Sequence, residues 1–203
     1  MKLAIEREEI RIGVVSDTHI PDRIKGLHPA LLPALRARQV DLILHAGDIS
    51  TPRVLAELEQ VAPVLAVRGN RDFAFWGKLP LVQTVEVGSV QIAMMHGHGN
   101  WKNYLWDKWQ YVREGYRLER YHPLLLGTVP DARVIIFGHT HRPVMTWQAG
   151  RMLFNPGSAS KILRAFDPTF GIIRVRHGHI IEGEIVDLQG DGQAPASRPL
   201  ARD

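Results

Sequence analysis

Five short polar motifs, each just after an apolar run, constrain this chain more than any other feature. The apolar runs are residues 12–15, 42–44, 64–67, 90–95 and 134–137. The motifs are Asp17-Thr18-His19, Gly47-Asp48, Gly69-Asn70-Arg71-Asp72, His96-Gly97-His98 and Gly138-His139-Thr140-His141. Short apolar runs of this kind predict buried strands. Because loops at the carboxyl ends of strands in an open α/β sheet gather at one edge, we expect the motifs to meet in one pocket.

The side chains in these motifs are those of a metal site. Two carboxylates (Asp17 and Asp48), one amide (Asn70) and several imidazoles form a mixed oxygen and nitrogen set without thiolates. Such a set suits Mn²⁺, Fe²⁺, Co²⁺, Zn²⁺ or Ni²⁺ better than Ca²⁺ or Mg²⁺. Two ions about 3.5–4 Å apart serve phosphatases and nucleases by in-line displacement. We therefore expect two divalent transition-metal ions, with manganese as the first choice.

Taken in order, the motifs resemble the calcineurin-like metallophosphoesterase superfamily. The short chain, His96-Gly97-His98 and the later Asn155-Pro156-Gly157-Ser158 resemble its small single-domain prokaryotic branch, the YfcE-type phosphodiesterases. The resemblance extends from about residue 10 to about residue 187 and implies an α/β fold, a four-layer α-β-β-α sandwich of two mixed sheets flanked by helices. It also implies a phosphodiesterase that hydrolyses phosphate esters by in-line attack of a metal-bridging hydroxide.

The resemblance also assigns a ligand to each metal position. It implies that one ion is bound by Asp17, His19 and His141. It implies that the other is bound by Asn70, His96 and His139, with Asp48 bridging the two. All seven positions carry a suitable side chain.

Arg71 departs from the wider superfamily, in which many members carry a histidine between the asparagine and the acidic residue. A guanidinium stays protonated at ordinary pH, so Arg71 cannot act as a general acid. It can still pair with phosphate oxygens and stabilise developing charge. We expect Arg71 and His98 to contact the phosphate, and the proton donor is either His98 or a metal-bound water. A missing donor favours diesters over monoesters.

Two alternatives to a phosphodiesterase remain open. One is a catalytically silent protein-interaction scaffold of the same fold, like the retromer small subunit, which resembles this branch but has lost catalysis. The other is a phosphomonoesterase or a nuclease. Larger nucleases of the superfamily carry extra DNA-binding domains, whereas the Lys and Arg residues of this chain are dispersed. We expect a phosphate-ester small molecule or a nucleotide as substrate, without a nucleic-acid partner.

Composition bounds the remaining possibilities. The 203 residues carry a formal net charge of +4 and no cysteine, which favours anionic substrates and leaves no disulfides. Residues 1–10 lack the apolar region of a signal peptide, and no apolar run reaches the roughly 18–20 residues of a membrane span. We therefore expect a cytoplasmic protein without a membrane partner. We expect one metallophosphoesterase domain over residues 1–188 and a disordered tail over residues 189–203.

The order of elements changes along the chain. Helices are predicted over residues 27–38, although Pro33 shortens the first, and over 51–60, where Pro52 takes the first helical position. Later, short strands are predicted over residues 143–147, 152–154, 171–176 and 180–188. Turns at Ala149-Gly150 and His177-Gly178 join them into hairpins.

Residues 100–122 are unusually aromatic. Trp101, Leu105, Lys108 and Trp109 fall at helical spacing, so one face of a helix is aromatic. The favoured interpretation is that this face packs on the sheet. The alternatives are a lid beside the site, a surface for homo-oligomer formation, or a platform that stacks on a nucleobase.

Other polar residues have structural interpretations. We expect His45 to be buried and hydrogen-bonded, with support of a metal ligand as the alternative. We expect Asp72 to fix its loop rather than bind metal. The run Asn155-Pro156-Gly157-Ser158 predicts a tight turn that, by the resemblance, packs beneath the metal edge. His177 and His179 are expected at the surface, and His28 and His122 in loops without a role.

Overall fold

Two β-sheets packed face to face form the centre of the protein. The computed structural model describes residues 2–3, 8–99, 101–161 and 166–189. One sheet has five strands in the order β11-β10-β2-β3-β4. Its strands are β2 (Glu9–Val15), β3 (Leu42–His45), β4 (Val64–Ala66), β10 (Thr169–Arg176) and β11 (His179–Asp187). Strands β2, β3 and β4 are parallel, whereas β10 runs antiparallel to β2 and β11, so the sheet is mixed.

The second sheet has six strands in the order β1-β5-β6-β7-β9-β8. Its strands are β1 (Lys2–Leu3), β5 (Val82–Val87), β6 (Val90–Met95), β7 (Val134–Ile136), β8 (Pro143–Gln148) and β9 (Arg151–Pro156). It is also mixed, because β1 is parallel to β5 and β6, β7 and β9 are parallel, while β5 is antiparallel to β6 and β8 is antiparallel to β9. The prediction of two mixed sheets is confirmed. The five apolar runs, however, are divided between the two sheets.

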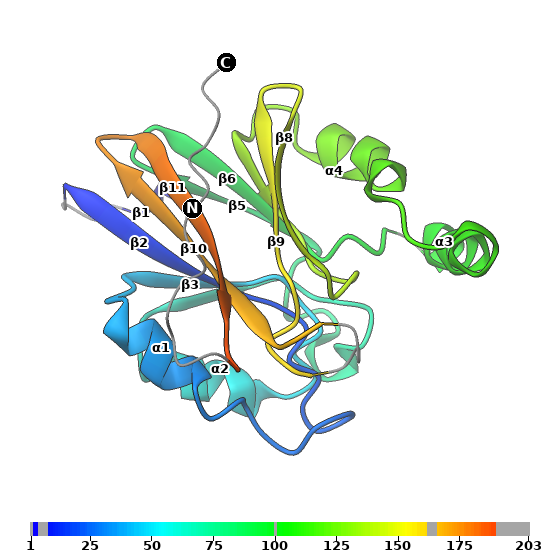
Figure 1. Cartoon of the computed structure of the whole chain (residues 1–203), viewed down its shortest axis with the longest axis horizontal. Coiled ribbons are helices and arrows are strands. Elements are labelled where there is room, and N and C mark those ends of the chain that lie inside the picture. The colour runs from blue at the N-terminus through cyan, green and yellow to red at the C-terminus, as the bar shows by residue number, and fades with distance from the viewer. Residues whose placement is uncertain (1, 4–7, 100, 162–165, 190–203) are drawn as a thin grey trace.

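Helices cover the outer faces of both sheets (Figure 1). Helices α1 (Leu31–Ala37) and α2 (Pro52–Glu59) pack on the five-stranded sheet. Helix α4 (His122–Thr128) and the short 3-10 helix η2 (Leu118–Arg120) pack on the six-stranded sheet. The predicted four layers, α-β-β-α, are confirmed. Among the described residues, none of the helices combines the length and apolar character that crossing a membrane requires.

The alternation of side chains along β2 explains how the layers are held. Ile12 and Val14 are fully buried between the two sheets, and Val15 faces the helices. A Cβ at Gly13 would lie 2.8 Å from Cδ2 of Leu35, so glycine here lets α1 approach the sheet closely. Because both faces of the strand are covered in its second half, residues 12–15 of β2 form an unbroken apolar run in the sequence.

The aromatic segment differs from its favoured interpretation. It forms α3 (Trp101–Glu114), but Leu105 is 55% exposed and Trp109 is 47% exposed, so the expectation of a core face is wrong. Instead Leu125 of α4 and the preceding Tyr121 fill the face of the six-stranded sheet. In Figure 1, α3 lies beyond α4, away from the sheets.

Several boundaries differ from the sequence predictions. Helix α1 begins at Leu31 rather than residue 27, and Pro33 lies in its first turn, where the missing N–H costs nothing. His122 begins α4 instead of lying in a loop, with Pro123 as an early helical residue. Strands β1 and β5 were not predicted. Of the tail predicted to be disordered, only Gln189 lies within the described residues.

Candidate metal centre

The five motifs meet where the two sheets adjoin. The loops after β2, β3 and β4 come from one sheet, and those after β6 and β7 come from the other. Within each sheet, backbone hydrogen bonds join the loops: Asp17 N donates to Gly47 O at 3.0 Å, and Gly138 N donates to His96 O at 3.1 Å. Across the two sheets, His139 N donates to Oδ2 of Asp17 at 3.1 Å. Convergence of the motifs is therefore confirmed, although it depends on two sheet edges rather than one.

Left-handed backbone is concentrated at these loops. Five of the seven predicted ligands have positive φ angles. They are Asp17 (55°), His19 (51°), Asp48 (55°), His139 (68°) and His141 (55°). Residues other than glycine adopt this conformation rarely, and such residues cluster at functional sites because the surrounding structure holds them there. The loops are therefore shaped to aim these side chains, at a local cost in backbone energy.

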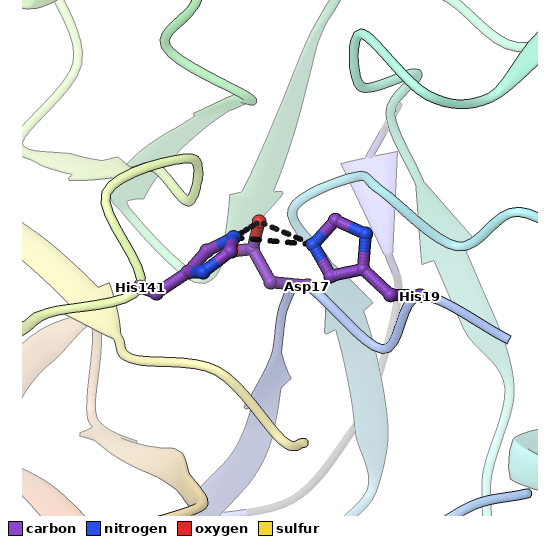
Figure 2. A group of neighbouring side chains, drawn as sticks. All are labelled: Asp17, His19 and His141. Carbon is purple, nitrogen blue, oxygen red and sulfur yellow. Dashed lines mark hydrogen bonds and ion pairs between the residues drawn. The ribbon is translucent and has the colours of Figure 1, made fainter. Parts of the chain in front are cut away.

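Asp17, His19 and His141 form the first group (Figure 2). Nε2 of His141 lies 3.1 Å from Oδ1 of Asp17, and Nε2 of His19 lies 3.6 Å from the same oxygen. The two Nε2 atoms are 3.1 Å apart. Oδ1 of Asp17 is buried and accepts no hydrogen bond from the described residues. Three atoms that can act as metal ligands therefore surround one point, an arrangement that suits a cation.

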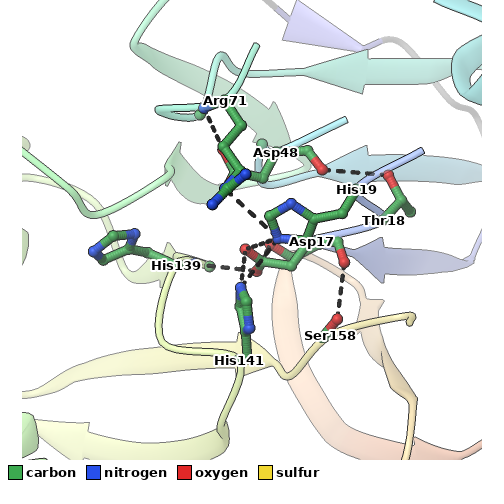
Figure 3. Close-up of polar contacts among 12 residues, drawn as sticks. Asp17, Thr18, His19, Asp48, Arg71, His139, His141 and Ser158 are labelled. Carbon is green, nitrogen blue, oxygen red and sulfur yellow. Dashed lines mark hydrogen bonds and ion pairs between the residues drawn. The ribbon is translucent and has the colours of Figure 1, made fainter. Parts of the chain in front are cut away.

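The other carboxylate oxygen of Asp17 is fixed by the protein. Oδ2 accepts hydrogen bonds from Ser16 Oγ at 2.6 Å and from His139 N at 3.1 Å. The carboxylate is therefore oriented by one oxygen while the other remains available to a ligand. Figure 3 shows Asp17 at the centre of these contacts.

Asp48 lies between the first group and a second one. Its Oδ2 is 3.6 Å from Nε2 of His19, and its Oδ1 is 3.4 Å from Nε2 of His96. Oδ1 of Asn70 lies 3.1 Å from both Nε2 of His96 and Nδ1 of His139. Asp17, Asp48 and His96 also form a set whose ligand atoms lie within 4.8 Å of one another. The residues present thus fit two neighbouring cations.

Electrostatics favour cation binding between the carboxylates. Burial raises the pKa of Asp48, but the charge of His96, its hydrogen bond to Asp48 and the charge of His19 together lower the pKa to about 2. Burial lowers the pKa of His96, yet Asp48 and Asp17 raise it to about 10. Burial lowers the pKa of His139 to about 3. Ionised Asp48 and neutral His139 have the protonation states that metal ligands require, whereas His96 has to lose its proton when a cation binds.

Asp72 holds the loop that carries Asn70, as predicted. Its two carboxylate oxygens accept hydrogen bonds from four backbone N–H groups, at 2.7–2.9 Å. The donors are Asp48, Ile49, Ser50 and Gly69. The side chain therefore ties the loop after β4 to the loop after β3 and has no remaining role as a metal ligand.

His45 is buried and hydrogen-bonded, also as predicted. Nδ1 accepts a hydrogen bond from Gly47 N at 3.2 Å, and Nε2 lies 3.3 Å from Thr18 Oγ1. Burial lowers the pKa of His45 to about 3. Because Thr18 and Gly47 adjoin Asp17 and Asp48, the ring also supports the two ligand loops.

Asn155 and Ser158 lie beneath the ligand loops. Asn155 Nδ2 donates to Gly138 O at 2.8 Å, and Ser158 Oγ donates to Asp17 O at 2.8 Å. Asn155 and Pro156 end β9 rather than forming the predicted tight turn, and Gly157, with a φ of 82°, donates its N–H to Asn155 Oδ1 at 2.9 Å. The expectation that this run packs under the metal edge is confirmed.

Arg71 lies at the mouth of the centre and pairs with Asp22, at 2.8 Å between Nη1 and Oδ2. A cavity of about 330 Å³ opens here. Its lining includes His19, Asp48, Asn70, Arg71, Tyr104, His139 and His141. Sequence reasoning missed Asp22 and the site-facing role of Tyr104, whose ring centroid is 5.7 Å from that of His139. Neither belongs to a recognisable motif.

His98 is half-buried behind the second group. Its ring centroid lies 5.3 Å from that of His96 and 6.2 Å from that of His139. Burial lowers the pKa of His98 to about 4, so the ring is neutral near pH 7. His177 and His179 are exposed, as predicted, and His177 Nε2 lies 3.2 Å from Glu8 Oε1.

Residues 10–178 match the calcineurin-like phosphoesterase superfamily domain, and the chain belongs to this family of metallophosphoesterases. It is 38% identical to a probable metallophosphoesterase of Methanothermobacter thermautotrophicus over 175 residues, which cover 86% of this chain and 91% of the relative. It is 26% identical to a protein of Methanocaldococcus jannaschii named as a phosphodiesterase, over 81% of this chain and 92% of that protein.

Solved structures support the fold. A vacuolar protein sorting 29 structure from Cryptosporidium parvum superimposes with a TM-score of 0.71 at 19% identity, over 97% of this chain and 100% of that one. A predicted phosphoesterase of Streptococcus pneumoniae superimposes with a TM-score of 0.61 at 22% identity, over 96% and 98% of the two chains. The architecture is therefore that of the metallophosphoesterase fold.

Proposed function

We propose that this chain is a dinuclear metal-dependent phosphodiesterase. The position of Asp48 carries the proposal. Its two oxygens face different histidines, His96 at 3.4 Å and His19 at 3.6 Å, as a carboxylate that bridges two ions does. The family supplies the broader class, a phosphoesterase of the hydrolases. The relative named as a phosphodiesterase supports the diester over the monoester.

The ligands of each ion follow from the two groups. Asp17, His19 and His141 would hold one ion, and Asn70, His96 and His139 the other, with Asp48 shared. Manganese suits this donor set, which mixes imidazole nitrogen with oxygen. Two bound cations would supply positive charge to the phosphoryl oxygens and would lower the pKa of water, so that hydroxide would be available near neutral pH.

Arg71 supplies positive charge to the substrate, whereas His98 does not supply a strong acid. The pair with Asp22 holds the Arg71 guanidinium at the mouth of the cavity, where it can reach a phosphate oxygen and stabilise charge. His98 is neutral near pH 7 and cannot act as a strong acid. Without a strong proton donor, a diester is the better substrate, because its lower charge needs less neutralisation.

Metal removal and restoration test the proposal. The purified protein is stripped with a chelator, reloaded with Mn²⁺ or Mg²⁺, and assayed on bis(p-nitrophenyl) phosphate and on p-nitrophenyl phosphate. We expect turnover to vanish on chelation, Mn²⁺ to restore it better than Mg²⁺, and the diester to react faster. Turnover that survives complete metal removal, or a preference for the monoester, would overturn the proposal. Bound metal without turnover on either ester would favour the interaction scaffold.

A further inference from the structure

A second hollow, of about 600 Å³, opens beside the candidate metal centre. It shares Asn70, Arg71 and Tyr104 with the cavity over the ligand side chains. We call it the aromatic cleft, and its remaining walls include Arg68, Phe73, Trp76 and Leu81. A group bound there lies next to a phosphate held at the metal centre.

The loop between β4 and β5 sets two aromatic rings into this cleft. The 3-10 helix η1 (Phe73–Phe75) buries Phe75, which is 5% exposed, in the core under the five-stranded sheet. Phe73 begins η1 and Trp76 directly follows it, and both side chains line the cleft, 74% and 72% exposed.

Hydrogen bonds hold this loop in place, so it cannot cover its own apolar side chains. Asp72, the residue before η1, is 2% exposed and accepts the backbone hydrogen bonds described above. Arg68 N donates to Pro80 O at 2.8 Å, which closes the base of the loop. Phe73 and Trp76 are thus held in contact with water. Exposure of these apolar rings costs free energy, and an apolar ligand that covers them would remove this cost.

The charges around the cleft indicate what kind of ligand it takes. The guanidinium of Arg68 lies 4.5 Å from the centroid of the Trp76 ring, and Arg71 lies between the cleft and the metal centre. Arg71, at the end next to the metal centre, attracts a phosphate, whereas the exposed rings of Phe73 and Trp76 at the other end favour a planar aromatic group. A small molecule that binds at both ends of the cleft therefore carries both a phosphate and an aromatic ring.

We propose that the aromatic cleft binds a planar aromatic group, such as a nucleobase, on the ester part of the phosphodiester substrate, with Phe73 and Trp76 as stacking residues. This inference rests on the proposed function, because the cleft is placed relative to a phosphate at the metal centre. Stacking tolerates any base, since every base has a π face, so the cleft selects for the presence of a base rather than its identity.

Binding of two matched ligands tests the proposal. Adenosine 5′-monophosphate and ribose 5-phosphate share the phosphate and the sugar and differ in the base. Their dissociation constants are measured by calorimetry on the full chain loaded with Mn²⁺. We expect the adenosine compound to bind roughly 5- to 150-fold more tightly, the range that stacking on aromatic side chains provides.

Variants then locate the effect. Trp76→Ala and Phe73→Ala should each reduce the advantage of the adenosine compound by about fivefold or more, while binding of ribose 5-phosphate stays unchanged. Because both side chains are exposed, neither variant should lower the unfolding temperature. Trp109→Ala is the matched control: this tryptophan is 47% exposed, on α3, and is not among the described residues that line the cleft.

Three outcomes would overturn the proposal. They are equal affinity for the two ligands, an equal loss for both in Trp76→Ala, and a dimer that Trp76→Ala dissociates without changing nucleotide binding. The last would assign the rings to an interface between copies of this chain. A base preference in a protein that hydrolyses no ester would uphold the cleft and overturn the proposed function, and turnover without a base preference would do the opposite.

Discussion

The Nε2 atoms of His19 and His141 lie 3.1 Å apart, although the two residues are separated by 122 positions in the chain. His19 follows β2 of one sheet and His141 follows β7 of the other. Both rings face Oδ1 of Asp17, at 3.6 and 3.1 Å. Two imidazole nitrogens and a carboxylate oxygen aimed at one point form a candidate cation site.

The bridging role of Asp48 predicts how metal content responds to mutation. Asp48→Ala removes a ligand from both ions, so both should be lost or greatly weakened, whereas Asn70→Ala should affect mainly one. Elemental analysis of the purified proteins measures this directly. Asp131→Ala, which removes an exposed carboxylate, is the control and should keep full metal content. Near-full content in Asp48→Ala would rule out the bridge.

Gly69 should be intolerant of any side chain. A Cβ there would lie 2.1 Å from Oδ1 of Asp48 and 2.3 Å from its backbone nitrogen. Gly69→Ala should therefore displace Asp48, lower the free energy of unfolding by about 1–3 kcal/mol and reduce metal content. Gly26→Ala is a matched control, because a Cβ at Gly26 meets no described atom within 4 Å. Urea unfolding and metal analysis that give the same result for both variants would contradict this account.

Arg71 should act by stabilising charge and not by moving a proton. Arg71→Ala should lower turnover by a factor on the order of 10²–10³ with both metals retained, since it removes one fixed cation. Arg71→Lys should recover only part of the rate, because an ammonium cannot reproduce a bidentate guanidinium. Unchanged turnover in Arg71→Ala would show that the pair with Asp22 keeps the guanidinium away from substrate.

Arg71→His should change the ester preference. It installs the histidine that many members of the wider superfamily carry at this position, and a protonated imidazole can donate to a leaving group. We expect monoester turnover to rise relative to diester turnover. The ratio of kcat/KM on a matched pair of esters measures this. A constant ratio, with metals still bound, would mean that this position does not control the preference.

His45 should make the metal-free protein sensitive to acid. Burial lowers its folded pKa to about 3, below the unfolded value near 6.5. Its contribution to stability is therefore complete above pH 6.5 and is lost as the pH falls toward 3, because only the unfolded chain takes up the proton. One such group changes the free energy of unfolding by about 1.4 kcal/mol per pH unit.

Urea unfolding between pH 6.5 and 4.5 tests the role of His45. The slope of stability against pH should be smaller in His45→Gln than in the unmodified protein. His177→Gln, which changes an exposed histidine, should leave the slope unaltered. The same slope in all three proteins would assign the acid sensitivity to other groups.

Local patterns were enough to predict most strands and the motifs that meet at the candidate metal centre. The residues of each motif are adjacent, and each follows a short apolar run, so Asp17, Asp48 and Asn70 could be recognised without knowing the topology. The start of α2 was equally local, with Thr51 extended at φ −142° before Pro52. Asp72 and His45 were interpreted correctly as residues that hold the loops by hydrogen bonds to nearby backbone N–H groups.

Only the tertiary structure decided which elements share a surface. The spacing of Leu105 and Trp109 predicts an apolar helix face, but not what covers it, and α4 already fills the sheet beside them. The division of the five runs between two sheets, the pair of Arg71 with Asp22, and the cleft formed by Phe73 and Trp76 all depend on contacts distant in sequence. Neighbouring residues determine the local conformation and the chemistry of each motif. Which element packs on which face depends on the whole chain, because every apolar face gains free energy when it is buried.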